Sequence, residues 1–256
     1  MTQEEMNRLV PQKLEELEKR HEIRVLLAVE SGSRAWGFAS PDSDFDVRFI
    51  YVHRPEFYLQ LQGCRDVIEE PVDDIWDVSG WDLDKTLRLL QKSNPTLFEW
   101  LNSPIVYRET GFSQRIQPLL GEYFSVKSEL YHYLNTARHH IKEYLQGEMV
   151  RPKKYFYALR PILACRWVLD RKTPPPALFS ALADAELPAG LVPSVDRLLD
   201  LKINGPEKMV IPPIREINRY LDDSMEELTI AMSQLPEEAQ RDWAPLNQFF
   251  LDEISR

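Results

Sequence analysis

Residues 32–50 read GSRAWGFASPDSDFDVRFI and decide the fold of this chain. They follow the apolar run 25–29 and end in a second apolar run, which predicts two strands flanking a loop. Alternate side chains of a strand share a face, so Asp44 and Asp46 point the same way with Cα atoms about 6.6 Å apart, and both carboxylates can reach one hard cation. The small pair Gly32 and Ser33 sits at the turn after the first strand, where backbone N–H groups can approach a phosphate. The stretch therefore predicts a site for a metal-bound nucleotide.

Each part of this stretch also has a simpler interpretation. Asp44 and Asp46 follow the turn-forming residues 41–43 and can belong to an Asx-type turn. A Gly-Ser pair by itself is typical of an ordinary turn. The simpler interpretation leaves the spacing between the pair and the acids unexplained, and it does not account for the strand that follows. We therefore favour the nucleotide site.

Composition restricts the function classes. The chain has 256 residues, 43% of them hydrophobic, and a formal net charge of −10, which argues against broad nonspecific attraction to polyphosphate chains but leaves room for a local basic groove. The two cysteines, Cys64 and Cys165, have no metal-ligand spacing and fit a reducing compartment. The acidic N-terminus lacks the pattern of a signal peptide, and no apolar run is long enough to span a bilayer. We expect a cytoplasmic protein without a membrane partner.

The periodicity of apolar residues predicts strands in the first part of the chain and helices in the second. Strands are expected at 25–30, 45–52, 66–70 and 75–79, and the strand signal largely vanishes after residue 107. Helices are expected at 4–21, 83–90, 96–101, 112–120, 127–145, 154–169, 177–185, 195–203, 213–235 and 243–254. An α/β head followed by a helical remainder is the simplest account of this order.

Four segments resemble one family of nucleotidyltransferases. A Gly-Ser pair, a spacer of about ten residues and then Asp-x-Asp on a strand resemble the signature of the DNA polymerase β-like nucleotidyltransferase superfamily. Residues 32–51, 77–83, 93–105 and 153–161 are similar to its RNA-repair-pathway DNA polymerase β family. The resemblance extends to about residue 170 and implies an α+β fold. Its nucleotidyltransferase head, a mixed sheet flanked by helices, is expected at 1–108, and an all-helical C-terminal domain at 109–256.

The resemblance also implies a divalent ion, Mg²⁺ with Mn²⁺ as the alternative, held by Asp44, Asp46 and a third acid. We predict Asp77 as the third catalytic and metal-binding acid, because it lies on a short predicted strand directly before the Ser79-Gly80 turn. Asp73 and Asp74 compete for this role. Asp82 is better placed to cap the next helix. The simpler interpretation of Asp77 is a solvated acid on a strand.

The residues expected to bind the nucleotide form two groups. In the first, Gly32 and Ser33 bind the β- or γ-phosphate through N–H groups and the serine hydroxyl. Arg34 reaches the triphosphate or the acceptor, or else forms a surface salt bridge with an acid such as Asp42.

The second group lies on one predicted helix. Lys153, Tyr157 and Arg160 recur at helical spacing along one stripe, with Lys154 beside them. The resemblance favours a role in binding the triphosphate and the nucleoside, and the simpler interpretation is a solvated positive face that pairs with acids.

The sequence thus predicts a Mg²⁺-dependent nucleotidyltransferase that transfers a nucleoside monophosphate from a nucleoside triphosphate to a hydroxyl or similar acceptor and releases pyrophosphate. The acceptor is left open between an RNA end, a small molecule and a protein. The alternative function is a catalytically inactive nucleotide-binding module of the same fold, which regulates or interacts with a partner.

Overall fold

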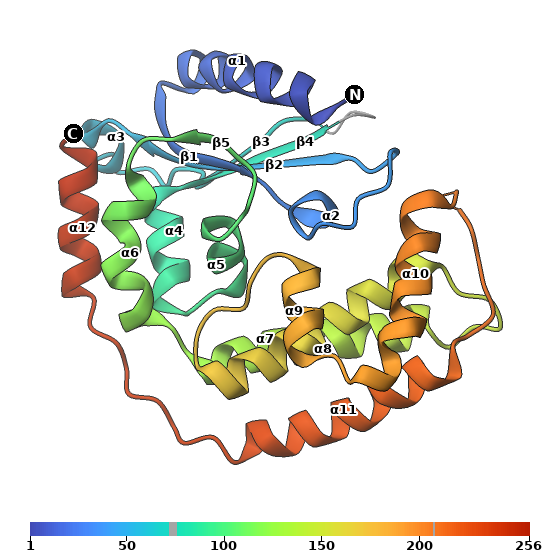
Figure 1. Cartoon of the computed structure of the whole chain (residues 1–256). Coiled ribbons are helices and arrows are strands. Elements are labelled where there is room, and N and C mark those ends of the chain that lie inside the picture. Colours follow the sequence, from blue (N-terminus) through green and yellow to red (C-terminus); the bar gives the residue numbers. More distant parts are fainter. Residues whose placement is uncertain (72–75, 207) are drawn as a thin grey trace. The chain divides into compact units, whose positions relative to one another are not determined.

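The computed structural model describes residues 1–71, 76–206 and 208–256 of the chain (Figure 1). Their contacts divide the chain into two compact units. We call Met1–Ala35, Asp44–Phe124 and Gln240–Arg256 the sheet unit, and Trp36–Ser43 with Ser125–Ala239 the helical unit. The boundaries of these units differ from those of the predicted domains, 1–108 and 109–256. The assignment of those domains stays a prediction.

The sheet unit contains a five-stranded sheet with the order β3-β4-β2-β1-β5. Strands β2 and β4 are parallel, and the other neighbouring pairs are antiparallel. The strands are β1 (Ile23–Glu30), β2 (Phe45–His53), β3 (Val67–Glu69), β4 (Trp76–Asp82) and β5 (Val106–Glu109). This mixed sheet confirms the predicted α+β fold. Strand β5 was not among the predicted strands, because this short, half-exposed edge segment has no alternation of apolar residues.

Helices cover both faces of the sheet. Those of the sheet unit are α1 (Gln3–His21), α2 (Gly32–Ala35), α3 (Pro55–Tyr58), α4 (Leu83–Gln91), α5 (Pro95–Leu101), α6 (Phe112–Tyr123) and α12 (Ala244–Ile254). Helix α1 lies over one face, and α4, α5, α6 and α12 lie on the other (Figure 1). Asp82 caps α4 as predicted, its side chain accepting the N–H of Asp84.

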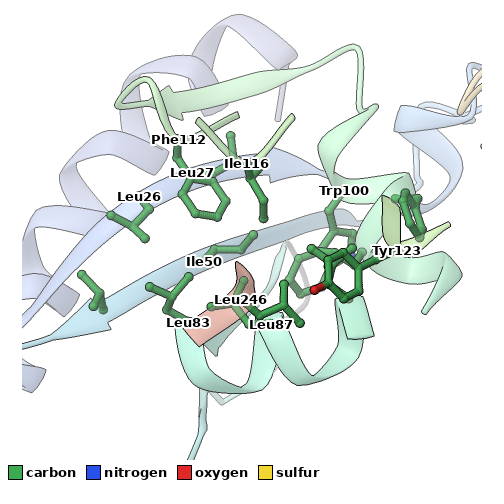
Figure 2. Packing of buried hydrophobic residues seen from close by; sticks show 14 of the residues in the cluster. Leu26, Leu27, Ile50, Leu83, Leu87, Trp100, Phe112, Ile116, Tyr123 and Leu246 are labelled. Atoms are coloured by element: carbon green, nitrogen blue, oxygen red, sulfur yellow. The ribbon is translucent and has the colours of Figure 1, made fainter. Parts of the chain in front are cut away.

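The alternation along β2 separates two hydrophobic cores. Phe45, Val47 and Phe49 pack with the buried stripe of α1, whereas Ile50 and Val52 join the core on the other face. Figure 2 shows this second core, in which side chains from the sheet meet α4, α6 and α12. Because Phe45, Val47 and Phe49 are buried on one face of β2, Asp46 and Arg48 lie on the opposite face, in the first half of the strand.

The helical unit is built around α8, whose residues Tyr155, Phe156 and Leu159 are fully buried. Its helices are α7 (Val126–Tyr144), α8 (Pro152–Arg171), α9 (Phe179–Glu186), the 3₁₀ helix η1 (Ala189–Leu191), α10 (Val192–Asn204) and α11 (Arg215–Ser233). The loop 36–43 belongs to this unit, and its Phe38 ring packs against the rings of Phe156 and Phe179.

Within the described ranges, none of the helices combines the length and the apolar character that crossing a bilayer requires.

Candidate active site

The structure brings the predicted Gly-Ser turn and the predicted acids together. Gly32 has φ +59°, and a Cβ atom added to it would lie 2.2 Å from Oδ2 of Asp46. The backbone N–H of Ser31 donates to the carbonyl oxygen of Asp46 at 2.8 Å. Only glycine lets the backbone pass this close to the carboxylate in this conformation. The end of β1 and the start of β2 therefore face each other across Gly32 and Asp46.

Asp77 lies beside Asp46 on the neighbouring strand. The two residues are direct partners in the parallel register of β2 and β4, so their side chains share one face of the sheet. Both carboxylates contact one guanidinium nitrogen: Nη2 of Arg48 lies 3.0 Å from Oδ1 of Asp46 and 2.7 Å from Oδ2 of Asp77. Asp73 and Asp74, the alternatives for the third acid, lie outside the described residues.

Asp44 and Arg34 lie next to this pair. The Asp44 residue is exposed and directly precedes β2, and its carbonyl oxygen accepts a hydrogen bond from Nε of Arg34 at 3.1 Å. The guanidinium carbon of Arg34 also lies 3.6 Å from the centre of the Phe45 ring, a cation–π contact. Arg34 and Ser33 are half-buried. Gly32, Ser33, Arg34, Asp44, Asp46 and Asp77 thus come from adjacent elements of one unit.

The electrostatics of Asp46 favour a further positive charge. Burial raises the pKa of this carboxyl, the Arg48 guanidinium opposes the rise, and the charges of Asp77 and Asp44 add to it. The Asp46 side chain still keeps 30% of its surface exposed. A cation entering from solvent would therefore relieve both the desolvation and the repulsion between the acids.

Glu30 is a buried acid of this region that the sequence analysis did not single out. It is fully buried at the end of β1, where one carboxylate oxygen accepts the N–H of Asp46 at 2.7 Å and the other accepts the O–H of Tyr107. Burial raises its pKa to about 7. Its signal in the sequence is an acid that ends a wholly apolar run immediately before Ser31 and Gly32.

Arg48 was missed as well, although a simple signal exists. It follows Asp44 and Asp46 at the same two-residue interval, so the strand period places it on the face of the acids. The alternation of this segment predicted only a strand, and no role was predicted for its polar face.

The second predicted group lies in the helical unit, on α8. The Lys154 ammonium lies 3.5 Å from the centre of the Tyr144 ring, and the Tyr157 ring contacts those of His140 and Trp36. Lys153 and Lys154 are half-buried, but Arg160 is only 3% exposed.

The Arg160 guanidinium lies 4.5 Å from the centre of the Trp36 ring, and it donates to the Ala177 carbonyl oxygen at 3.4 Å. The four residues therefore share one helix but not one exposed stripe. Their contact with a nucleotide stays a prediction.

The carboxylates of Asp46 and Asp77 are of the chemical type that binds Mg²⁺. Among the residues that the structure describes, no group of three or more His, Cys, Asp or Glu is arranged to hold a metal. Mg²⁺ is commonly bound through only one or two carboxylates together with the phosphates of a substrate. Asp46 and Asp77 meet that need, because their carboxylates already converge on one cationic group, the Arg48 guanidinium.

Comparisons with known proteins agree with the resemblance. The family model described as the RNA repair pathway DNA polymerase beta family matches residues 6–252. The chain is 43% identical over 255 residues to the "Uncharacterized protein YcgL" of Bacillus subtilis (strain 168), covering 97% of this chain and 96% of that relative.

A solved structure, of a nucleotidyltransferase-like protein from Exiguobacterium sibiricum 255-15, aligns over 97% of this chain and 79% of that one. Its TM-score of 0.32 and identity of 11% are too low to support any conclusion. The family match does not depend on this structural alignment. The family model covers nearly the whole sequence, and the match confirms the predicted family. This chain belongs to the RNA repair pathway DNA polymerase beta family.

Proposed function

We propose that this protein is a metal-dependent nucleotidyltransferase, which transfers a nucleoside monophosphate from a nucleoside triphosphate to an acceptor hydroxyl or similar group. The observation that carries the proposal is the pairing of Asp46 and Asp77 on parallel strands, with the Asp46 carboxylate against the backbone of Gly32. A pair of acids beside a glycine turn suits a metal-bound polyphosphate, because the acids hold the ion and the turn admits the phosphates.

The acids and the turn have separate roles in this proposal. Asp44, Asp46 and Asp77 hold Mg²⁺, with Mn²⁺ as the alternative, and Gly32 and Ser33 hold the β- or γ-phosphate. When bound, the ion supplies positive charge that neutralises the triphosphate and stabilises the oxygens that attack and leave. Arg34 adds a fixed charge beside the triphosphate.

The transfer itself needs no covalent intermediate on the protein. An oxygen of the acceptor hydroxyl forms a bond to the α-phosphorus, and the bond from that phosphorus to the oxygen bridging to the β-phosphate breaks. Pyrophosphate leaves with the bonding electrons, and the hydroxyl proton passes to solvent. The protein contributes positioning and charge, which is where most catalysis of phosphoryl transfer resides.

The helical unit contributes positive charge in this proposal. Burial lowers the pKa of Lys154, and the charges of Lys153 and Arg151 lower it further, so three cations are crowded at the start of α8. An anion bound there would relieve the repulsion. We assign the basic residues Lys153, Lys154 and Arg160 to the triphosphate and Tyr157 to the nucleoside. The Arg160 guanidinium also lies over the Trp36 ring.

The acceptor belongs to one of three classes: an RNA end, a small molecule or a protein. The description of the family favours RNA, and the net charge of −10 suits a small molecule or a protein equally well. We place the reaction in the cytoplasm, in keeping with the free cysteines Cys64 and Cys165.

The test is transfer of label from each α-labelled nucleoside triphosphate, with Mg²⁺ or Mn²⁺, to RNA, to small hydroxyl compounds and to proteins, followed together with pyrophosphate release. Asp46→Asn and Asp77→Asn are each expected to lower the rate by about 100-fold or more, since they remove charge that acts on the transition state. Asp252→Asn, an exposed acid on α12, is the matched control and is expected to keep the wild-type rate.

Two results would contradict the proposal. If Asp46→Asn keeps metal-dependent transfer, the acids are not the metal site. If the protein binds nucleotide and releases no pyrophosphate with any acceptor, the alternative of an inactive nucleotide-binding module is correct.

A further inference from the structure

The Arg48 guanidinium contacts both strands that carry the acids, β2 and β4. Its Nη2 atom contacts the carboxylates of Asp46 and Asp77, while Nη1 donates to the carbonyl oxygens of Val47 at 3.1 Å and Asp77 at 2.9 Å. The side chain is only 18% exposed. The guanidinium group therefore bridges the paired strands β2 and β4 through contacts with both.

The position of Nη2 is the one that a metal ion shared by these acids would need. The two carboxylate oxygens lie 3.0 Å and 2.7 Å from this single nitrogen. Two carboxylates on paired strands repel each other, and a cation between them removes that repulsion. Because arginine stays protonated in proteins, its charge is present at every physiological pH. The structure thus supplies the acids with a cation of its own.

We propose that Arg48 acts as the built-in counter-ion of Asp46 and Asp77 in the nucleotide-free protein. It competes with the divalent ion for the same carboxylate oxygens, so the ion binds weakly until a triphosphate arrives. The triphosphate then offers the guanidinium another anion, to which its planar donors are well suited. This inference rests on the proposed function, since it concerns the same site.

The consequence is a thermodynamic coupling between metal and nucleotide. Each ligand removes a reason for Arg48 to stay on the carboxylates, so each raises the affinity for the other by the same factor. A protein without the arginine would bind the metal well by itself and gain little from nucleotide. The sign of this effect separates a competing counter-ion from a residue that only holds the acids in place, whose loss would weaken metal binding.

The experiment measures Mn²⁺ binding by electron paramagnetic resonance, with and without a saturating non-hydrolysable nucleoside triphosphate. Without nucleotide, Arg48→Gln is expected to bind Mn²⁺ about tenfold more tightly than the wild type, in the range typical of coupling between sites. With nucleotide, the wild type is expected to gain about tenfold and Arg48→Gln much less. Arg54→Gln removes an exposed arginine just beyond the other end of β2, and we expect it to match the wild type.

A second variant keeps the test valid if Arg48→Gln does not fold, which thermal unfolding would reveal. Arg48→Lys keeps the charge but has no planar fork to reach two strands at once, so Mn²⁺ displaces it more easily. We expect its affinity for Mn²⁺ to exceed that of the wild type by about threefold, within the same coupling range.

Three outcomes would overturn the inference, and they are distinguishable. If the wild type binds Mn²⁺ with nucleotide and Asp46→Asn does not, but the Arg48 variants bind it as tightly as the wild type, the inference fails alone. If the Arg48 variants bind Mn²⁺ more weakly, Arg48 only orients the acids. If no form of the protein binds Mn²⁺ under either condition, the inference and the proposed metal site fail together.

Discussion

Glu30 and Asp82 are two buried acids of the sheet unit with nearly identical local chemistry and different neighbours. Each ends a strand, is at most 2% exposed, and accepts one tyrosine O–H and one backbone N–H. Burial raises the pKa of both to about 7. The backbone donor of Glu30 is Asp46, whereas that of Asp82 is Asp84 in the first turn of α4. Burial and a raised pKa therefore do not distinguish a candidate site from a helix cap, and the identity of the neighbouring residues does.

The largest effect is expected at the Glu30 end of the sheet, from Gly32→Ala. The new Cβ would lie 2.2 Å from Oδ2 of Asp46 at a φ of +59°, so the carboxylate must move. We expect nucleotide transfer to fall by at least about 100-fold, the range seen when a group that stabilises the transition state is lost. Steady-state kinetics would measure it.

Gly121→Ala is the matched control. This glycine lies in α6, where an added Cβ meets nothing within 4 Å, so we expect full transfer and a gain in stability of up to about 1 kcal/mol. Retention of transfer by Gly32→Ala would break the comparison, because the Glu30 end would then be no more active than the Asp82 end.

The second prediction concerns the Asp82 end, through Asp82→Asn. An acid whose folded pKa lies at about 7, above its usual value of 3.8, binds its proton more tightly in the folded state. The contribution of Asp82 to the free energy of unfolding is therefore fully present below about pH 4 and is lost as pH rises to about 7. His53, 4.0 Å away, has a pKa lowered to about 4 by burial, so its own titration raises stability over much of the same range, in the wild type and in Asp82→Asn alike. The difference between the two proteins therefore isolates the contribution of Asp82.

Asparagine keeps the cap and removes the titration, so we expect Asp82→Asn to lose this pH dependence and to exceed the wild type at pH 7 by about 2–4 kcal/mol. Chemical denaturation at pH 4 and pH 7 measures both quantities. Equal pH dependence in the two proteins would show that Asp82 is charged in the folded state.

The sequence predicted the parts of the site that depend on short-range pattern. Gly32, Asp44 and Asp46 lie within one loop and the start of one strand, and Asp77 lies on a predicted strand. The turn predicted at Ser79-Gly80 was wrong, because both residues continue β4 and pair with β2. Arg48 and Glu30 were missed for different reasons. Arg48 shares the period of the acids and was overlooked, whereas a glutamate that ends a strand is usually solvated, and only the packing of Tyr107 and Asp46 around Glu30 buries it.

The fold was predictable to a similar extent. The apolar strands and long helices have strong periodicity, but β5 is short and half-exposed, so its pairing with β1 provides the only signal. The membership of 36–43 in the helical unit and of 240–256 in the sheet unit depends on contacts between distant segments, which local pattern does not encode.

The third prediction compares the two tyrosines that serve the buried acids. Tyr107→Phe and Tyr58→Phe each leave a buried carboxyl without one donor, so we expect each to cost about 1–3 kcal/mol of stability. Only Tyr107→Phe should also lower transfer, by about tenfold, because Glu30 holds the backbone of Asp46. Thermal unfolding and kinetics of both variants would measure this. Equal losses of transfer would remove the distinction between the two acids.

The smallest effect extends the comparison to the helical unit. Lys154→Met removes one of the crowded cations of α8, and we expect KM for the triphosphate to rise about fivefold with kcat little changed, the pattern for loss of uniform binding. Lys142→Met, on the exposed side of α7, is the control and should leave KM unchanged. An unchanged KM in Lys154→Met would remove this helix from the proposed nucleotide site.

The return of the chain to the sheet unit has a consequence for biosynthesis. Leu246 of α12 is 1% exposed within the core of that unit, and the carboxylate of Glu253 binds Arg115 of α6. The sheet unit, most of which precedes the helical unit in the chain, therefore lacks part of its own interior until α12 has been made. A premature stop codon shortly before α12 would leave the helical unit complete and the nascent sheet open to chaperones and proteases.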